Sequence, residues 1–461
     1  MAVRHRLWLH NAMQLVHVTE SSACSLLSGN EQRSVAVSKA DDNDRLSLIV
    51  HSDGTILDYG SDSEMSAKYN RDDFDSVVDV DGCVLMPGLV DAHTHPVFAG
   101  DRVHEFAMKL AGASYMQDCG MYMRSPLLSS VFVFSIHESG GGIHFTVDRT
   151  RSATLDELTS GFATIVGQML LAGTTLVEAK SGYGLDADTE IKMLQAINNV
   201  MHSQPVEISA TFCGAHAVPK GSTAEQATDD VCDVQIPRLK HQIAETGMRV
   251  ENVDVFCEKG VFNVEQTRRI LMTAVDQLRL RINFHGDELH PTKSAELAAA
   301  LNATACSHLE EISEEGIKCM SASGTIGVML PTTAYMLRLR PPPVRAMIQQ
   351  GVPIALGSDF NPNAYCYAMP IVMHLACCLY GMSLEESLVG ATLNAAASLG
   401  RGLTHGALAR SRKADLICVQ APTWQHLVYR FGCHRELIKA VYKEGKLVAG
   451  GFSEKDGQSF D

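Results

Sequence analysis

Two histidines stand one residue apart at the end of a short apolar run. The stretch "VLMPGLVDAHTHPVFAGDR", from Val84 to Arg102, contains a Pro-Gly break and then His93 and His95. Alternate residues of a strand point to the same face, so both imidazoles could bind one divalent metal ion. They could equally be two buried side chains, each beside a polar partner. Because His-x-His also occurs by chance, the rest of the chain has to decide between these interpretations.

Six later apolar runs also end in polar residues that can do chemistry. In chain order these are Lys180 with Tyr183, His216, Glu258, His285 with Glu288, His308, and Asp359. Each has an ordinary explanation when taken alone. A lone histidine is usually structural, Asp359 could form an Asx-turn, and Glu288 could be a helix N-terminal charge. Independent coincidences would not place histidines or carboxylates after so many consecutive runs, so we interpret them as one site.

Three imidazoles and one carboxylate of this set form a donor group typical of zinc or iron. The expected ligands are His93, His95, His285 and Asp359. A remaining open position would hold a water molecule, whose pKa the metal lowers until hydroxide is available near neutral pH. Glu288 lies three residues beyond His285 and could shuttle the proton, and His308 could polarise the attacked carbonyl. The predicted chemistry is metal-dependent hydrolysis.

These residues can meet only if the runs that carry them lie side by side as parallel strands. The eight runs are "GLVDAHTH", "TTLVEAKSG", "ISATFCGAH", "VDVFCEKG", "INFHGDELH", "ATACSHLEE", "GTIGVMLP" and "PIALGSDFNP". Helix-like segments lie between them, such as 186–201, 264–278 and 292–302. Eight βα repeats predict an α/β fold, the (β/α)8 TIM-type barrel, with its active site at the carboxyl ends of the strands. An open doubly wound sheet gets little support, because no GxGxxG follows any run.

Both ends of the chain contain short strand-like runs separated by turn residues. The runs are "RLWLHNA", "RSVAVS", "RLSLIVHSDGTILDYG" and "SVVDVDGCVLMPG" before the barrel, and "ADLICVQAP" and "ELIKAVYKEGKLVAGG" after it. Glu444, Gly445 and Lys446 are typical of a hairpin turn. We therefore predict a small β-sandwich domain formed by residues 1–84 and 412–461, attached to a barrel of residues 85–411.

Composition restricts the class of protein. The chain has 461 residues, of which 46% are hydrophobic and 20% charged, as is ordinary for a globular enzyme. A net charge of -15 without a basic stripe argues against nucleic-acid binding, and no apolar run reaches the length of a membrane span. The thirteen cysteines form no CxxC pair. With no secretory signal, this predicts reduced thiols in a cytoplasmic protein that acts on a small molecule.

Together these motifs resemble the imidazolonepropionase family of the metal-dependent amidohydrolase superfamily. The resemblance is carried by "LMPGLVDAHTHP", "HTHPVFAGDRVHEF", "GGGIHFTV", "AGTTLVEAKSGYGL", "GAHAVPKG", "VDVFCEKGVF", "NFHGDELHP", "SHLEE", "LPTTAYMLR" and "LGSDFNPNA". It extends from the first strand-like runs to near Gly451. It implies hydrolytic opening of 4-imidazolone-5-propanoate to N-formimidoyl-L-glutamate in histidine degradation, and a homodimer, which is common in the superfamily.

The resemblance also implies roles for single residues. The metal ligands would be His93, His95, His285 and Asp359. The catalytic residues would be Glu288, His308 and Asp359, beside the activated water and the scissile carbonyl. The substrate-binding residues would be Arg102, Tyr183, His216, Glu288, Asn361, Asn363 and Ala364, with the guanidinium of Arg102 on the substrate carboxylate. Bacterial relatives more often have Gly and a small hydroxyl residue where this chain has Asn363 and Ala364.

The resemblance further favours one metal ion per subunit, zinc or iron. Dinuclear members of the superfamily use a carboxylated lysine on the fourth strand. Here the fourth run ends in Glu258, and Lys180 follows the second. A nucleobase or guanidine deaminase would share a mononuclear site and is the nearest alternative activity. The stretches "KSGYG", "GAHAVP" and "DFNPNA" favour the imidazolone substrate.

An additional segment interrupts the barrel pattern at about residues 118–136. It lies within "MQDCGMYMRSPLLSSVFVFSIHESGGGIHF", where the family usually has some twenty residues fewer. It is either a genuine loop at the active-site face or a gene-model error such as a retained intron. Its apolar run would be an aggregation hazard if exposed, which favours the error. If the segment is real and disruptive, the chain could instead be a non-catalytic amidohydrolase-like scaffold.

Overall fold

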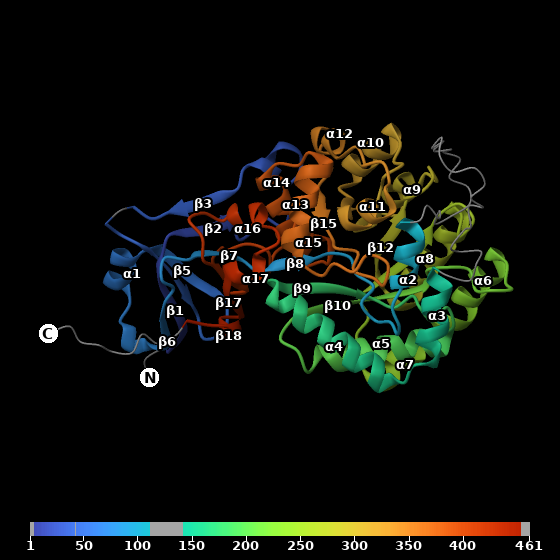
Figure 1. Ribbon diagram of the computed structural model, residues 1–461, viewed down its shortest axis with the longest axis horizontal. Coiled ribbons are helices and arrows are strands. Elements are labelled where there is room, and N and C mark those ends of the chain that lie inside the picture. Colours follow the sequence, from blue (N-terminus) through green and yellow to red (C-terminus); the bar gives the residue numbers. More distant parts are fainter. Residues whose placement is uncertain (1–3, 42, 111–141, 453–461) are drawn as a thin grey trace.

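The computed structural model describes residues 4–41, 43–110 and 142–452. The predicted additional segment at 118–136 lies outside these residues. The described strands form three sheets: one parallel sheet of eight strands and two further sheets of four and six strands. Figure 1 shows helices gathered around the eight-stranded sheet, with the two further sheets beside it at one end of an elongated molecule.

The eight predicted runs form the eight strands of the parallel sheet, neighbouring one another in chain order. They are β8 (Leu89–Asp91), β9 (Thr174–Lys180), β10 (Glu207–Ala215), β11 (Asn252–Cys257), β12 (Arg281–Gly286), β13 (Ala305–His308), β14 (Ile326–Met329) and β15 (Ile354–Leu356). The edge strands β8 and β15 meet through the residues after them. Asp359 N–H donates to His93 C=O over 2.9 Å, and His95 N–H donates to Phe360 C=O over 2.8 Å. The TIM-type barrel is confirmed, and the predicted ligands lie on the backbone that joins its first and last strands.

Helices connect these strands. They are α2 (Val103–Leu110), α3 (Ile143–Ser152), α4 (Leu155–Leu171), α5 (Ala187–Met201), α6 (Ala224–Asp230), α7 (Ile236–Thr246), α8 (Val264–Leu278), α9 (Ser294–Ala300), α10 (Glu314–Ser323), α11 (Pro331–Leu337), α12 (Val344–Gln349), α13 (Met369–Tyr380), α14 (Leu384–Gly390) and α15 (Leu393–Ser398). The predicted helices at 186–201 and 264–278 are confirmed. The Asp186 side chain accepts Thr189 N–H at the start of α5, and Asn263 caps α8 in the same way.

The third predicted helix, 292–302, is shorter than expected. It begins at Ser294, because Asp287 accepts both the N–H and the hydroxyl of Thr292, at 2.7 and 3.0 Å. Lys293 then has a left-handed backbone, with φ of 65°. Asp287 therefore holds the residues before the helix in a non-helical turn.

The two further sheets combine both ends of the chain. One has the order β5 (Ile56–Ser61), β4 (Leu46–Val50), β1 (His5–Ala12), β6 (Phe74–Asp79); helix α1 (Asp62–Lys68) follows β5. The other has the order β18 (Lys446–Gly450), β17 (Ile438–Lys443), β16 (Leu416–Val419), β7 (Val84–Pro87), β2 (Gln14–Val18), β3 (Ala36–Lys39). Helices α16 (His426–Tyr429) and α17 (His434–Leu437) lie between β16 and β17. The predicted joining of the two termini is confirmed.

The predicted hairpin turn between β17 and β18 is also present. Glu444 and Gly445 have φ of 48° and 72°, the left-handed conformation that a two-residue hairpin turn requires. Strand β7 pairs with both β2 and β16 and spans residues 84 and 85. The proposed division at that point stays a prediction.

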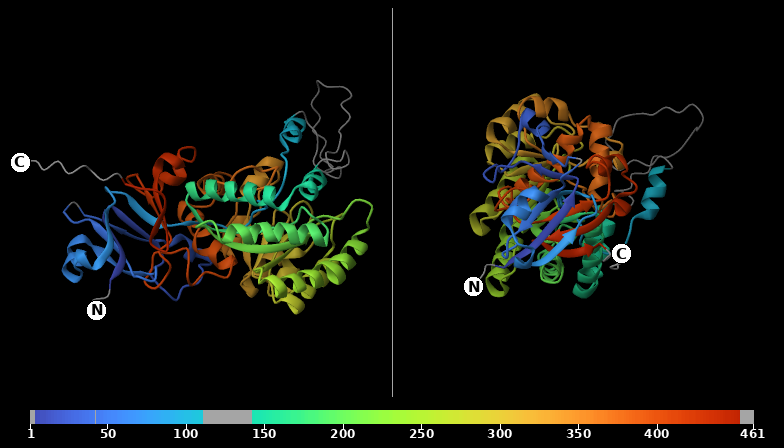
Figure 2. Two further views of the ribbon diagram at one scale, coloured as in Figure 1. Left: turned by 90° about the horizontal axis from the view of Figure 1, so that it is seen from below. Right: turned by 90° about the vertical axis from the view of Figure 1, so that its left-hand side faces the viewer.

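The barrel interior has an apolar layer and a polar layer. The apolar layer includes Val90, Leu176, Ala305, Val328 and Ala355, against which side chains of α15 pack. The polar layer lies nearer the carboxyl ends of the strands and belongs to the site described below. Figure 2 shows the barrel at one end of the molecule and the two further sheets at the other. Among the residues that the structure describes, every helix is too short or too polar to span a bilayer.

Candidate active site

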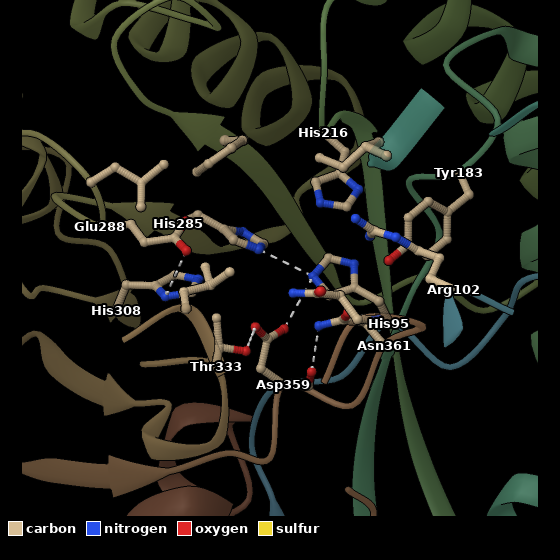
Figure 3. A pocket seen from close by; sticks show the side chains of 15 residues that line it. His95, Arg102, Tyr183, His216, His285, Glu288, His308, Thr333, Asp359 and Asn361 are labelled. Carbon is tan, nitrogen blue, oxygen red and sulfur yellow. Dashed lines mark hydrogen bonds and ion pairs between the residues drawn. The ribbon is translucent and has the colours of Figure 1, made fainter. Parts of the chain in front are cut away.

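The four predicted metal ligands converge at the carboxyl ends of the barrel strands. His93 and His95 follow β8, His285 lies on β12, and Asp359 follows β15. His285 Nε2 lies 3.2 Å from His93 Nε2 and 3.1 Å from His95 Nε2. Asp359 Oδ1 lies 3.5 and 3.7 Å from the same two nitrogens. Figure 3 shows His95, His285 and Asp359 directed toward one another.

Hydrogen bonds on the far side of the rings determine what the inner nitrogens can do. His285 Nδ1 lies 2.8 Å from the carboxylate of Asp254, so it carries the hydrogen and leaves Nε2 with a lone pair. That lone pair can accept one hydrogen bond, yet both His93 Nε2 and His95 Nε2 face it. Burial lowers the pKa of His93 and His95 well below the ordinary value, so additional protons do not relieve the contact. At least one of the two contacts to His285 Nε2 is therefore left without a good hydrogen bond.

A divalent cation fits this arrangement. Zinc–nitrogen bonds of about 2.05 Å in tetrahedral geometry place neighbouring donors about 3.3 Å apart, close to the donor spacing seen here. Asp359 Oδ1 is buried and accepts no hydrogen bond within the described residues, while Oδ2 accepts the Thr333 hydroxyl at 2.5 Å. Burial raises the pKa of Asp359 to about 6. The three nitrogens and Oδ1 thus form a donor set that a cation would complete.

Backbone strain is concentrated at the same strand ends. Asp287, His308 and Asp359 have φ of 49°, 76° and 46°, which is uncommon for residues other than glycine. Such strain clusters at active sites, where the surrounding structure holds side chains in required directions. The observation agrees with a site at this end of the barrel.

A cavity beside the donor set is lined by most of the other predicted residues. Its lining includes Arg102, Tyr183, His216, Glu288, His308, Asn361 and Asn363. His308 Nδ1 lies 3.8 Å from Glu288 Oε1. Burial, and then the charges of Glu310 and Asp359, raise the pKa of Glu288 well above its ordinary value. The cavity therefore places a carboxyl that holds a proton readily beside a neutral imidazole.

His216 and Tyr183 form one wall. The His216 ring stacks on His95, with centroids 4.5 Å apart and planes within 11°. Its Nδ1 lies 2.9 Å from Gly182 C=O. Gly182 has φ of 114°, and a Cβ there would come within 2.9 Å of His216 Nδ1. Only glycine lets the "KSGYG" turn approach the histidine so closely.

Arg102 lies beside Tyr183 in the cavity lining (Figure 3) and is almost fully buried. Its Nε and Nη2 lie 2.8 and 2.6 Å from Glu105 Oε2. The other oxygen of Glu105 accepts Gly142 N–H at 2.8 Å. The carboxylate of Glu105 thus orients one edge of the guanidinium that the resemblance assigns to the substrate.

The stretch after Asp359 is held by Asn361. Its Oδ1 accepts the N–H groups of Asn363 and Ala364 at 2.7 and 3.1 Å, and its Nδ2 donates to Asp359 C=O at 2.7 Å. Asn361 and Asn363 line the cavity. Ala364 does not: it lines a neighbouring cavity with Tyr335 and Tyr365, and its N–H is bonded to Asn361.

Several residues of the site were not predicted. Ser307 Oγ lies 2.9 Å from His93 Nδ1, Thr333 bonds Asp359, and Asp254 bonds His285. Asp254 could have been predicted from the sequence, because it lies on the same strand face as Glu258 in "VDVFCEKG". Glu258 itself accepts the N–H groups of Leu289 and His290 and so holds the loop after β12.

Comparison with known proteins identifies the family. Residues 84–448 match the amidohydrolase family. A protein of Nematostella vectensis named probable imidazolonepropionase is 52% identical over 440 residues, covering 95% of this chain and 98% of its own. The protein of Homo sapiens with that name is 50% identical over 448 residues, covering 97% and 99%.

Solved structures agree on the fold. An adenosine deaminase from Xanthomonas campestris with bound zinc superposes with a TM-score of 0.67 at 17% identity, covering 96% of this chain and 93% of that one. A guanine deaminase from C. acetobutylicum gives 0.65 at 15% identity, covering 96% and 99%. At such low identity these structures show the fold alone, and the family follows from the sequence relatives. This chain belongs to the amidohydrolase family and, within it, to the imidazolonepropionases.

Proposed function

We propose that this protein hydrolyses 4-imidazolone-5-propanoate to N-formimidoyl-L-glutamate. The observation that carries the proposal is the convergence of three imidazole nitrogens and Asp359 Oδ1 beside a cavity lined by Glu288, His308 and Arg102. Relatives about 50% identical over nearly the full length bear the name of this activity. In the reaction, water adds to the ring carbonyl carbon, the C–N bond of the cyclic amide breaks, and the ring nitrogen takes a proton.

The cation would be held by His93, His95, His285 and Asp359. Within the described residues, the groups of three histidines or carboxylates close enough to share a cation overlap in this one place and combine these four residues with His216 and His308, which supports a single ion per subunit. Nitrogen and carboxylate donors suit zinc and iron. When bound, the cation would supply the Lewis acidity that activates water near neutral pH.

Glu288 and His308 are proposed to move the proton. The carboxyl of Glu288 takes a proton from the attacking water and returns it to the leaving ring nitrogen. Burial and neighbouring carboxylates raise the pKa of Glu288, which favours return of the proton after Glu288 has accepted it from water. His308, held neutral by burial, is positioned to donate a hydrogen bond to the carbonyl oxygen as negative charge develops there.

The remaining lining would bind and orient the substrate. Arg102 offers a guanidinium edge to the propionate, a pairing that is strong and directional. Tyr183 and His216 present an aromatic wall for the ring, and the Asn361 turn lies in the lining beside Asp359. The proposal includes Ala364 only as part of that turn.

Two broader statements belong to the proposal. The cysteines of the described residues are all free thiols, which supports a reduced, cytoplasmic setting. We also propose a homodimer, on the family resemblance, to be checked by light scattering of the purified protein.

The test is metal analysis and turnover on the same preparation. We expect about one zinc or iron ion per subunit and hydrolysis of 4-imidazolone-5-propanoate, both lost in His285→Ala. The matched control is His241→Ala, an exposed histidine on α7, which should retain both. Stoichiometric metal with no turnover of this substrate, but with turnover of a nucleobase or guanidine amine, would replace the proposed reaction by deamination.

A further inference from the structure

A buried lysine lies in the barrel interior, and the proposed reaction makes no use of it. Lys180, the last residue of β9, is 1% exposed. Its Nζ lies 2.7 Å from Glu178 Oε2 and 2.7 Å from Asp254 Oδ2. Burial opposes its charge, but the two carboxylates outweigh that effect and hold the pKa of Lys180 above its ordinary value. The ammonium is therefore a fixed positive charge between two strands.

Asp254 connects this lysine to a proposed metal ligand. Its two carboxylate oxygens have different partners. Oδ2 faces Lys180, whereas Oδ1 accepts both Nδ1–H and the backbone N–H of His285, at 2.8 and 3.1 Å. A carboxylate with only one engaged oxygen can turn about its Cβ–Cγ bond, and one engaged at both oxygens cannot. Lys180 therefore fixes the orientation in which Asp254 holds the His285 ring.

Glu178, the other carboxylate beside Lys180, is also held by hydrogen bonds. Glu178 Oε1 accepts the Thr211 hydroxyl at 2.6 Å, and the Glu178 backbone C=O accepts the Thr94 hydroxyl at 2.5 Å. Thr94 lies between His93 and His95 in the sequence. Buried contacts thus run from Thr94 through Glu178, Lys180 and Asp254 to His285. They connect the segment after β8, which carries two proposed ligands, to β12, which carries the third.

Stability alone does not require this arrangement. Bringing three charged groups into a barrel interior incurs a desolvation penalty that well-packed apolar residues avoid, and such replacements are often neutral or stabilising. Metal binding, in contrast, does benefit from such contacts. The outer hydrogen-bond partner of a metal-binding histidine sets the orientation of the ring, and loss of that partner typically lowers metal affinity by about 10–100-fold.

We propose that Lys180 is a positioning residue for the cation site, which holds Asp254 so that His285 directs Nε2 to the other donors. The inference rests on the proposed function through its cation site only. It does not depend on which substrate is hydrolysed.

The test is the affinity of the metal-free protein for Zn²⁺, measured by competition with a chromogenic chelator and without substrate. Lys180→Met keeps the length of the side chain and removes its ammonium. We expect its Kd for Zn²⁺ to rise by about 10–100-fold. The matched control is Lys443→Met, because Lys443 also lies between two carboxylates, Glu207 and Asp415, at the other end of the barrel. Lys443→Met should lower the melting temperature and leave the Kd unchanged.

A double variant separates positioning from the effect of an unpaired buried charge. Lys180→Met leaves Glu178 and Asp254 as two unpaired carboxylates, whereas Lys180→Met with Glu178→Gln restores the net charge of the wild-type group and keeps Asp254. We expect the double variant to regain the melting temperature of the metal-free wild type while its Kd stays at least tenfold raised. A Kd within threefold of wild type in Lys180→Met, or a Kd that recovers together with stability in the double variant, would overturn the proposal.

If Lys180→Met does not fold, the double variant decides alone by the same tenfold and threefold limits. The outcome is independent of the proposed reaction. A wild-type protein that binds Zn²⁺ tightly but hydrolyses no imidazolone would end the proposed function and leave the role of Lys180 standing.

Discussion

The two ends of the barrel both hold clusters of buried charged and titratable groups, yet the clusters are built in opposite ways. At the amino ends of the strands, Arg401 donates to Glu207 at 2.6 Å and to Glu251 at 2.7 and 2.8 Å. His405, Lys413 and Lys443 also reach Glu207. At the carboxyl ends, imidazole nitrogens face one another at 3.1 and 3.2 Å, and Asp359 Oδ1 accepts no hydrogen bond within the described residues.

Removal from water therefore has different electrostatic outcomes at the two ends of the barrel. Burial alone would raise the pKa of Glu251, but Arg401 and Arg281 lower it to about 2. Among the described residues, the groups that shift the pKa of Glu288 are carboxylates, which together with burial raise it. One end contains opposite charges that satisfy each other and join the barrel to β17. The other end contains like groups that an external cation would satisfy. We infer that the first end serves stability and the second serves binding.

The largest expected effect separates the two ends completely. In His285→Ala, we expect metal content to fall to zero and hydrolysis to fall to the uncatalysed background, because the central donor is gone. Metal analysis and a substrate assay measure both. Arg401→Met at the other end should keep metal and turnover but unfold at a lower temperature. Full metal content in His285→Ala would contradict the assignment of the ligands.

The next effect tests proton transfer within the carboxyl-end cluster. Glu288→Gln should retain the metal and lower kcat by about 10³-fold, the usual range for losing a general acid–base group. A pH–rate profile of variant and wild type measures it, with the variant losing the limb that reports the titration of Glu288. Glu311→Gln, three residues beyond the lining residue His308, is the control. An unchanged kcat in Glu288→Gln would remove it as the base.

The sequence predicted the features that follow from local pattern, but not the contacts between side chains that are far apart in the chain. The eight strands, the His93 and His95 pair and the distant His285 and Asp359 followed from local pattern and family resemblance, since strand ends of a parallel barrel meet at one edge. Asp254 and Ser307 were not predicted, because their partners His285 and His93 belong to other strand ends, and the barrel geometry decides which side chains meet. Lys180 was noted, but the sequence does not show which carboxylates face it.

The amino-end cluster was absent from the prediction for the same reason. Glu207, Glu251 and Arg281 each stand at or just before the start of a strand and look like ordinary surface charges in the sequence. Arg401 is more than a hundred residues away from all three. Local pattern does not specify a residue that reaches across the barrel base. The sequence also does not show that the backbone N–H of Ala364 donates to Asn361, because that hydrogen bond depends on the geometry of the turn.

Metal removal should affect stability in proportion to occupancy. A ligand that binds only the folded state at a hundred times its Kd stabilises it by about 2.7 kcal/mol. Chelation of the wild-type protein should therefore lower the melting temperature, and added Zn²⁺ should restore it. His285→Ala should show no shift with either treatment, whereas Arg401→Met should show the full shift from a lower starting point. A metal-independent melting temperature in the wild type would contradict the comparison.

The smallest effect is a difference in pH dependence between Glu251 and Glu288 in the metal-free protein. The pKa of Glu251 is about 2 in the folded chain, below the ordinary value of about 4.3. Its ionised form therefore stabilises the fold at neutral pH, and this stabilisation disappears as pH falls from about 4.3 toward 2. Glu251→Gln should lower the free energy of unfolding by about 2 kcal/mol at pH 7 and by much less near pH 3.

For Glu288 the sign is reversed. Its folded pKa is raised, so above about pH 4.3 the unfolded chain ionises while the folded chain holds the proton, and folding loses free energy as pH rises. Glu288→Gln should therefore stabilise the metal-free protein as pH rises above about 4.3, whereas Glu251→Gln should destabilise it there. Urea unfolding at several pH values measures both slopes, with the exposed Glu245→Gln as the control. If both substitutions changed the free energy of unfolding in the same direction, the two ends of the barrel would not differ in the way that their contacts indicate.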